Sequence, residues 1–171
     1  MKKNLSVLPL LFLMTAQTAD AAAAKPCFSH EDLSNMTLKM LPMVIDGAVD
    51  KCRSTLGASA YLTTAGPAFS QKVRADTADL DDRLRAAFER VSGKPLSSDE
   101  NANMTKTLND EVVRGMVDDI KPTSCVAMGE LVRAMAPLPT HQLGDLLGAL
   151  MTLATSGKVD PKFPVCPPES R

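Results

Sequence analysis

The chain has 171 residues, with 19 basic and 20 acidic side chains and a formal net charge of −1. A chain so close to neutrality, without a basic block, has no electrostatic footprint for nucleic acid. It contains no Trp, one Tyr and five Phe, so its core must be built mainly from aliphatic side chains and Met.

The N-terminus has the pattern of an export signal. The basic Met1-Lys2-Lys3 precedes an apolar run over 5–14, and Ala19-Asp20-Ala21 supplies the small residues that a signal peptidase reads. The apolar run is shorter than the roughly 20 residues of a membrane-spanning helix. We therefore expect a cleaved signal peptide over 1–21, with cleavage after Ala24 as the alternative, and a periplasmic or secreted protein without a membrane span. The remaining 22–171 has the size of one domain, with a Pro-rich tail from about 158.

Four cysteines follow the expected cleavage site, namely Cys27, Cys52, Cys125 and Cys166. An even number of cysteines in an exported chain predicts two disulfides. The cysteines are far apart, form no Cys-x-x-Cys pair and have no neighbouring His, so we expect no metal site and no cofactor.

The first half of the domain has helical periodicity. Ser29 and Asp32 have the spacing of a capping box, and Gly57 is the expected end of the first helical pattern. Pro42 falls inside this pattern, where it either kinks one helix or begins a second one. We expect Gly66-Pro67 to begin the next long helix, which runs to about Val91 with an apolar seam along one face.

The second half has the same character. Ser98 begins a helix whose apolar stripe consists of Met104, Leu108, Val112, Met116 and Ile120. Two closing segments over 125–136 and 141–155 are separated by a Pro-rich corner. The last has Leu147 and Leu150 on its apolar face, and we expect both to be core residues. We predict an all-α, single-domain bundle of five to seven helices, held by two disulfides.

The disulfide pairing depends on Pro42. The closing segments descend about 18 Å and climb back about 22 Å, which brings Cys166 to the level of Cys125. This arithmetic favours Cys125–Cys166 and leaves Cys27–Cys52, which requires Pro42 to begin an antiparallel helix. If Pro42 only kinks the helix, those two cysteines lie about 30 Å or more apart, and each bonds to one of the other two instead. The unbroken apolar phase favours the kink, whereas the hairpin geometry favours the turn.

Two groups of residues suggest chemistry but have simpler structural explanations. Met36, Met40 and Met43 share a helical side and could bind Cu(I), although a core stripe explains them better. His141 and Asp145 are four residues apart and could act as an acid–base pair, but we expect them, like His30, to be solvated helix-end side chains.

The most strongly charged stretch is a predicted helix that is rich in Asp and Arg. Its charged residues are Asp76, Asp79, Asp81, Asp82, Arg83, Arg85, Glu89 and Arg90. Paired carboxylates can serve glycoside hydrolysis, but mixed charges opposite an apolar seam are typical of a solvated face. Asp118-Asp119 is unusual because a helix end prefers cations, which suggests a contact site.

Several short segments with Cys or Pro are spread over most of the chain beyond the expected cleavage site, namely Cys27-Phe28, Leu41-Pro42, Cys52, Lys121-Pro122-Thr123-Ser124-Cys125, Ala136-Pro137-Leu138-Pro139 and Phe163-Pro164-Val165-Cys166. Together they resemble a loose group of exported bacterial four-cysteine helical proteins with no known activity. The resemblance implies an exported helical domain and carries over no catalytic residue.

We expect a non-enzymatic binding or interaction protein of the cell envelope, such as an inhibitor, an immunity factor or a chaperone, whose partner is another envelope protein or a small ligand. The alternatives are a small exported enzyme that uses the Asp/Arg-rich helix, and an envelope structural protein. Convergence of Asp82, Arg83, Arg85 or Glu89 in a deep pocket would favour the enzyme. A large exposed apolar patch would favour the structural protein.

Overall fold

The computed structural model describes residues 26–155 and 163–167. The predicted signal peptide and both cleavage positions lie outside these residues. Within them the chain forms seven α-helices and no multi-residue strand, which confirms the predicted all-α bundle. The helices are α1 (His30–Leu56), α2 (Tyr61–Asp76), α3 (Leu80–Ser92), α4 (Ser98–Thr107), α5 (Arg114–Asp118), α6 (Cys125–Met135) and α7 (Thr140–Thr155).

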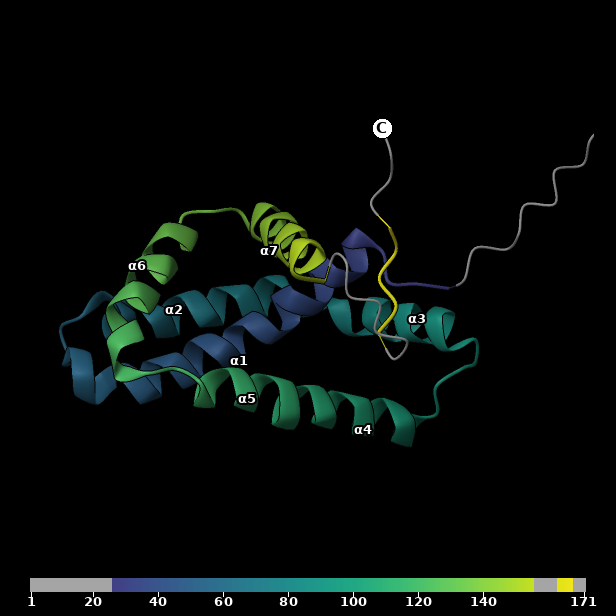
Figure 1. The fold of residues 1–171 in the computed structure, drawn as a ribbon, viewed down its shortest axis with the longest axis horizontal. Coiled ribbons are helices and arrows are strands. Elements are labelled where there is room, and N and C mark those ends of the chain that lie inside the picture. The colour runs from purple at the N-terminus through teal and green to yellow at the C-terminus, as the bar shows by residue number, and fades with distance from the viewer. Residues whose placement is uncertain (1–25, 156–162, 168–171) are drawn as a thin grey trace, which may run out of the picture.

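Helix α1 is the central element of the bundle. It contacts α2, α3, α5, α6 and α7, and in Figure 1 it runs between α2 on one side and the α4–α5 segment on the other. Its start is fixed by the predicted capping box: the Asp32 amide donates to Ser29 Oγ, and Asp32 Oδ2 accepts from the Ser29 amide at 2.6 Å. Its end is fixed by Gly57, whose φ of 80° suits a residue without Cβ.

Pro42 does not divide α1. The helix continues through it for 27 residues, although an internal proline removes one backbone hydrogen bond and costs about 3 kcal/mol. The Pro42 ring is fully buried, and its carbonyl accepts a hydrogen bond from Ser70 Oγ of α2 at 3.2 Å. Packing against α2 therefore offsets the local cost of the proline.

The two disulfides are Cys27–Cys166 and Cys52–Cys125. The favoured pairing of Cys125 with Cys166 and of Cys27 with Cys52 is therefore wrong. Because α1 is continuous, Cys27 and Cys52 lie at its opposite ends, about 35 Å apart at the rise of an α-helix. The expected pairing was wrong because it treated the segments over 125–136 and 141–155 as an antiparallel pair that returns the chain to the level of Cys125.

The expected helix from Pro67 to about Val91 is also corrected. Gly66 and Pro67 lie inside α2, and the break occurs instead at 77–79, between α2 and α3. Gly66 serves close packing, because a Cβ there would lie 2.8 Å from Val49 Cγ2 of α1. Thr77 is buried and its hydroxyl donates to the Val73 carbonyl at 2.8 Å, a bond that competes with the regular helix ladder.

A π-helical turn over Leu108–Val113 shifts the apolar stripe between α4 and α5. Val112 and Met116 were expected inside but are 37% and 44% exposed, whereas Val113 is 6% exposed. A π turn accommodates one extra residue, so the inward face advances by one position. Periodicity of four residues cannot reveal such a turn.

Helix α7 packs on α1 through small residues, and part of its leucine face is exposed. Leu143 is fully buried and Leu147 packs against the core, but Leu146, Leu150 and Leu153 are 45%, 52% and 70% exposed. The prediction that Leu150 is a core residue is therefore wrong. Gly148 approaches α1 so closely that a Cβ would lie 2.2 Å from Ser34 Oγ.

The described part of the tail is bound to the start of the domain. Val165 forms a parallel bridge with Phe28, whose amide donates to the Pro164 carbonyl at 2.8 Å. The Phe28 ring stacks on Phe163 and meets the edge of Phe88 of α3. In Figure 1 the yellow segment containing Val165 passes α3 at the end of the bundle. This contact and Cys27–Cys166 close the second of two hydrophobic clusters, which also contains Met36 and Met40.

Candidate functional site

A cavity of about 730 Å³ opens between α1, the corner joining α2 to α3, and α4. This volume is within the range of small-ligand sites, roughly 300–1,000 Å³. The cavity is lined by Met36, Lys39, Met40, Pro42, Met43, Arg74, Thr77, Ala78, Asp81, Leu84, Arg85, Phe88, Asn101 and Met104.

The floor of the cavity is apolar and rich in Met. Met36 and Met40 of α1 are 3% and 7% exposed, and Met43 is partly buried against the same cluster. Met104 adds a fourth thioether from α4. The Met residues of α1 therefore continue the core stripe, as expected, and also line the cavity. Unbranched thioether side chains adapt their shape to what they contact.

The rim of the cavity, formed by Lys39, Arg74, Asp81 and Arg85, is charged. Lys39 Nζ of α1 lies 2.8 Å from Asp81 Oδ1 of α3, so one ion pair joins two walls. Arg74 pairs with Asp46 of α1. The rim thus sets three cations around an apolar floor.

Arg85 has a weaker partner. Its Nη2 lies 3.3 Å from Asp82 Oδ1, one turn back on the same helix, and the Asp82 side chain is 89% exposed. Ion pairs that are so solvated contribute little stability. The Arg85 guanidinium can therefore exchange this partner for a ligand at small cost.

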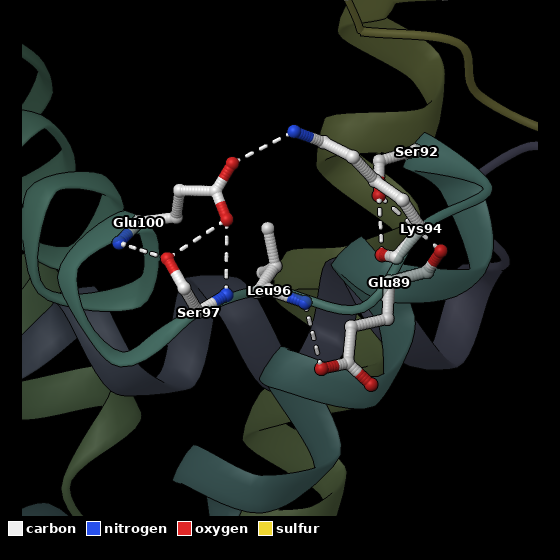
Figure 2. A network of polar contacts seen from close by, with 6 residues as sticks. All are labelled: Glu89, Ser92, Lys94, Leu96, Ser97 and Glu100. Carbon is white, nitrogen blue, oxygen red and sulfur yellow. Dashed lines mark hydrogen bonds and ion pairs between the residues drawn. The ribbon is translucent and has the colours of Figure 1, made fainter.

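The α4 wall is positioned by the polar network of Figure 2. Glu100 accepts hydrogen bonds from the Ser97 amide and hydroxyl, and Lys94 Nζ lies 2.7 Å from Glu100 Oε1. In the segment that joins α3 to α4, Glu89 Oε1 accepts a hydrogen bond from the Leu96 amide at 3.0 Å. The Lys94 bond, followed by the two Ser97 bonds, lowers the pKa of Glu100 from 4.5 to about 2. This network fixes the first turn of α4, directly before Asn101 and Met104.

Most charged residues of the Asp/Arg-rich helix do not line the cavity. Of its charged residues, Asp81 and Arg85 line the cavity. Others connect α3 to α1: Arg83 Nη1 lies 3.8 Å from Glu31 Oε1, and Arg90 pairs with Asp32. We interpret most of this helix as an ion-paired surface that holds α3 against α1.

The histidine candidates lie on the surface. His30 is exposed at the start of α1, and His141 and Asp145 are exposed on α7. Among residues 26–155 and 163–167, no group of three or more His, Cys, Asp or Glu is placed to hold a metal ion. The exposure of His30, His141 and Asp145 agrees with the expectation that they are solvated helix-end side chains.

The acidic pair at the end of α5 has a structural partner. Lys51 of α1 donates to the carbonyls of Val117 and Asp118 at 3.0 and 2.6 Å. The cation that a helix C-terminus favours therefore comes from a neighbouring helix. This contact is internal to the domain.

Sequence reasoning did not identify the cavity. Arg74, Ala78 and Asn101 lie on three separate segments, and neither their type nor their spacing marks a site. The available signal was the Met stripe of α1, whose thioethers were assigned to the core alone.

The chain matches no protein-family model, no curated protein and no solved structure in the comparisons. The resemblance to exported four-cysteine proteins remains a prediction. Over the part of the chain that the structure describes, no helix combines the length and apolar character needed to cross a membrane.

Proposed function

We propose that this protein is an exported, non-enzymatic binding protein that holds a small ligand in the Met-lined cavity. The observation that carries the proposal is the cavity itself, which combines a volume of about 730 Å³ and a floor of thioethers with a charged rim. Export is supported by the N-terminal sequence pattern and by the two disulfides, which are typical of oxidising compartments.

The enzyme alternative is less well supported. Catalysis by the Asp/Arg-rich helix would require its carboxylates to face a common substrate, yet Asp82 is solvated and Arg83 points to Glu31. Among the described residues, every buried side-chain nitrogen or oxygen atom has a hydrogen-bond partner. The described part of the cavity therefore contains no buried polar side-chain atom without a partner, and such an atom is what would have marked a candidate catalytic group.

The binding proposal can be tested with N-phenyl-1-naphthylamine, an uncharged probe that fluoresces in apolar surroundings. Ala78 is exposed at the corner between α2 and α3 and lines the cavity, whereas Ala86 is exposed on α3 outside the lining. We expect the oxidised protein and Ala86→Phe to bind the probe, and Ala78→Phe to lose most of this binding. Absence of binding to the unsubstituted protein, or equal binding by both variants, would contradict the proposal.

A second candidate, an envelope structural or interaction protein, is favoured by the exposed leucines of α7. Leu146, Leu150 and Leu153 follow one another at helical spacing and are all exposed. Replacing Leu150 and Leu153 by Ser leaves the buried Leu143 contact intact. Release of this variant from the envelope fraction into the soluble fraction would support the candidate, and an unchanged distribution would count against it.

A further inference from the structure

Most apolar side chains that line the cavity are more buried than the charged ones. Among the buried lining residues, Pro42 is fully buried, and Met36, Met40 and Leu84 are 3%, 7% and 8% exposed. Thr77 is also buried there, but its hydroxyl is bonded to the Val73 carbonyl. The cationic groups of the rim are more accessible, with Arg74 and Arg85 side chains 54% and 49% exposed. A ligand that fills this space must have an apolar part toward the floor and a polar part toward the rim.

The charge facing the cavity is predominantly positive. Lys39, Arg74 and Arg85 line it, but Asp81 is the one carboxylate of the lining residues, and it is bonded to Lys39. The partners of Arg74 and Arg85, Asp46 and Asp82, lie outside the lining. The lining therefore contributes three cationic side chains but one carboxylate, and the carboxylates that pair with Arg74 and Arg85 lie outside it.

Arg85 is the group best placed to bind an anion. A guanidinium carries five N–H donors and binds carboxylate or phosphate through two parallel bonds. Its present partner is a solvated neighbour on the same helix turn, so exchange breaks no contact between helices. Arg74 and Lys39, by contrast, hold α2 and α3 to α1 through their ion pairs.

We propose that the cavity binds an amphipathic anion, a single flexible apolar chain that ends in a carboxylate or phosphate held by Arg85. This inference rests on the proposed function and adds the chemical class of the ligand. The Met floor accepts a flexible chain because thioether side chains repack at little cost. A cavity of about 730 Å³ is far larger than a bare Cu(I) ion requires, so a methionine-bound metal leaves most of the volume unexplained.

The test uses three ligands with the same twelve-carbon chain: dodecanoate, dodecanol and dodecyltrimethylammonium. Displacement of N-phenyl-1-naphthylamine from the oxidised protein is measured for each ligand, with dodecanoate and the ammonium kept below their critical micelle concentrations and dodecanol below its solubility limit. We expect dodecanoate to bind about tenfold tighter than dodecanol, because a charge-assisted hydrogen bond adds to the same apolar contact. The ammonium should bind most weakly.

Arg85→Gln is the informative variant and Arg83→Gln is its control, since Arg83 is exposed on the same helix and does not line the cavity. We expect Arg85→Gln to lose about tenfold in dodecanoate affinity and to leave dodecanol binding unchanged. Arg83→Gln should change neither. Equal effects of both variants on dodecanoate would overturn the inference.

The outcomes separate the inference from the proposed function. If the neutral probe and dodecanol bind but dodecanoate has no advantage, or if the ammonium binds most tightly, the ligand class is wrong and the binding function stands. If no apolar ligand binds, both are wrong. If dodecanoate binds with the expected advantage, vesicles of phosphatidylglycerol identify the source of the anion: sedimentation of the protein with the vesicles indicates a bilayer lipid, and binding of dodecanoate without such sedimentation indicates a free acid.

Discussion

Cys52, one turn before the end of α1, is bonded to Cys125, the first residue of α6, with their Cα atoms 5.5 Å apart. Both side chains are buried, at 0% and 1% exposure, in the same hydrophobic cluster as Leu62 and Val132. Cys27–Cys166 lies beyond the other end of α1 and joins the two ends of the described domain. The central helix is thus held by one disulfide at each end.

This pairing can be checked by mapping peptides from the unreduced protein. We expect one linked pair containing Cys52 and Cys125, and another containing Cys27 and Cys166. The double variant Cys52→Ala/Cys125→Ala should lose about 2–5 kcal/mol of stability, because a long loop is no longer closed in the unfolded chain. A linked peptide containing Cys27 and Cys52 would contradict a continuous α1.

Gly148→Ala should destabilise the packing of α7 on α1. A Cβ at this position would lie 2.2 Å from Ser34 Oγ and 3.2 Å from Ser34 Cα, so the backbones must separate. We expect a loss of about 1–3 kcal/mol, as overpacking usually costs, measured by chemical denaturation. Gly115→Ala is the control, because a Cβ there meets nothing within 4 Å; it should be neutral or stabilising by up to about 1 kcal/mol. Equal denaturation midpoints for the two variants would show that α7 does not approach α1 at Gly148.

Two leucines of α7 should differ sharply in their contribution to stability. Leu143 is 0% exposed, whereas Leu150 is 52% exposed. Leu143→Ala should cost about 2–5 kcal/mol, as buried truncations do. Leu150→Ala should stay within about 0.5 kcal/mol, like most surface changes. If thermal unfolding shows that Leu150→Ala loses more stability than this, the exposed leucine face is covered in solution.

The stability that Glu100 gives to the start of α4 should depend on pH over a defined range. Because the pKa of Glu100 is lowered from 4.5 to about 2 in the folded protein, the ionised form is favoured by folding. Its contribution is fully present above about pH 4.5 and is lost as the pH falls toward about 2. Side-chain NMR titration of the Glu100 carboxyl should therefore give a midpoint well below that of an exposed glutamate.

Lys94→Met provides the control for this titration. The Lys94 hydrogen bond is the largest cause of the lowered pKa, the two Ser97 hydrogen bonds come next, and the charge of Lys94 lowers the pKa further. The variant should move the Glu100 midpoint part of the way back toward 4.5. A midpoint of 4.5 in the unsubstituted protein would show that the network of Figure 2 does not form in solution.

Local chemistry in the sequence was sufficient to predict the helical class and several helix ends. The capping box at Ser29, the end at Gly57 and the end near Val91, where Gly93 caps α3 with a φ of 72°, each depend on residues close together in the chain. Backbone hydrogen bonds at helix ends are satisfied locally, so neighbouring residues suffice to predict them.

Tertiary structure alone decided the continuity of α1, the break at Thr77 and the disulfide pairing. Pro42 in a helix is unfavourable locally and is tolerated because α2 packs against it. The cavity likewise exists only where Met36 of α1, Arg85 of α3 and Met104 of α4 come together. Sequence periodicity identifies which face of each helix is apolar, but the distance and angle between helices depend on contacts such as Gly148 on Ser34. Gly148 and Ser34 are more than a hundred positions apart, and no local pattern in the chain encodes their contact.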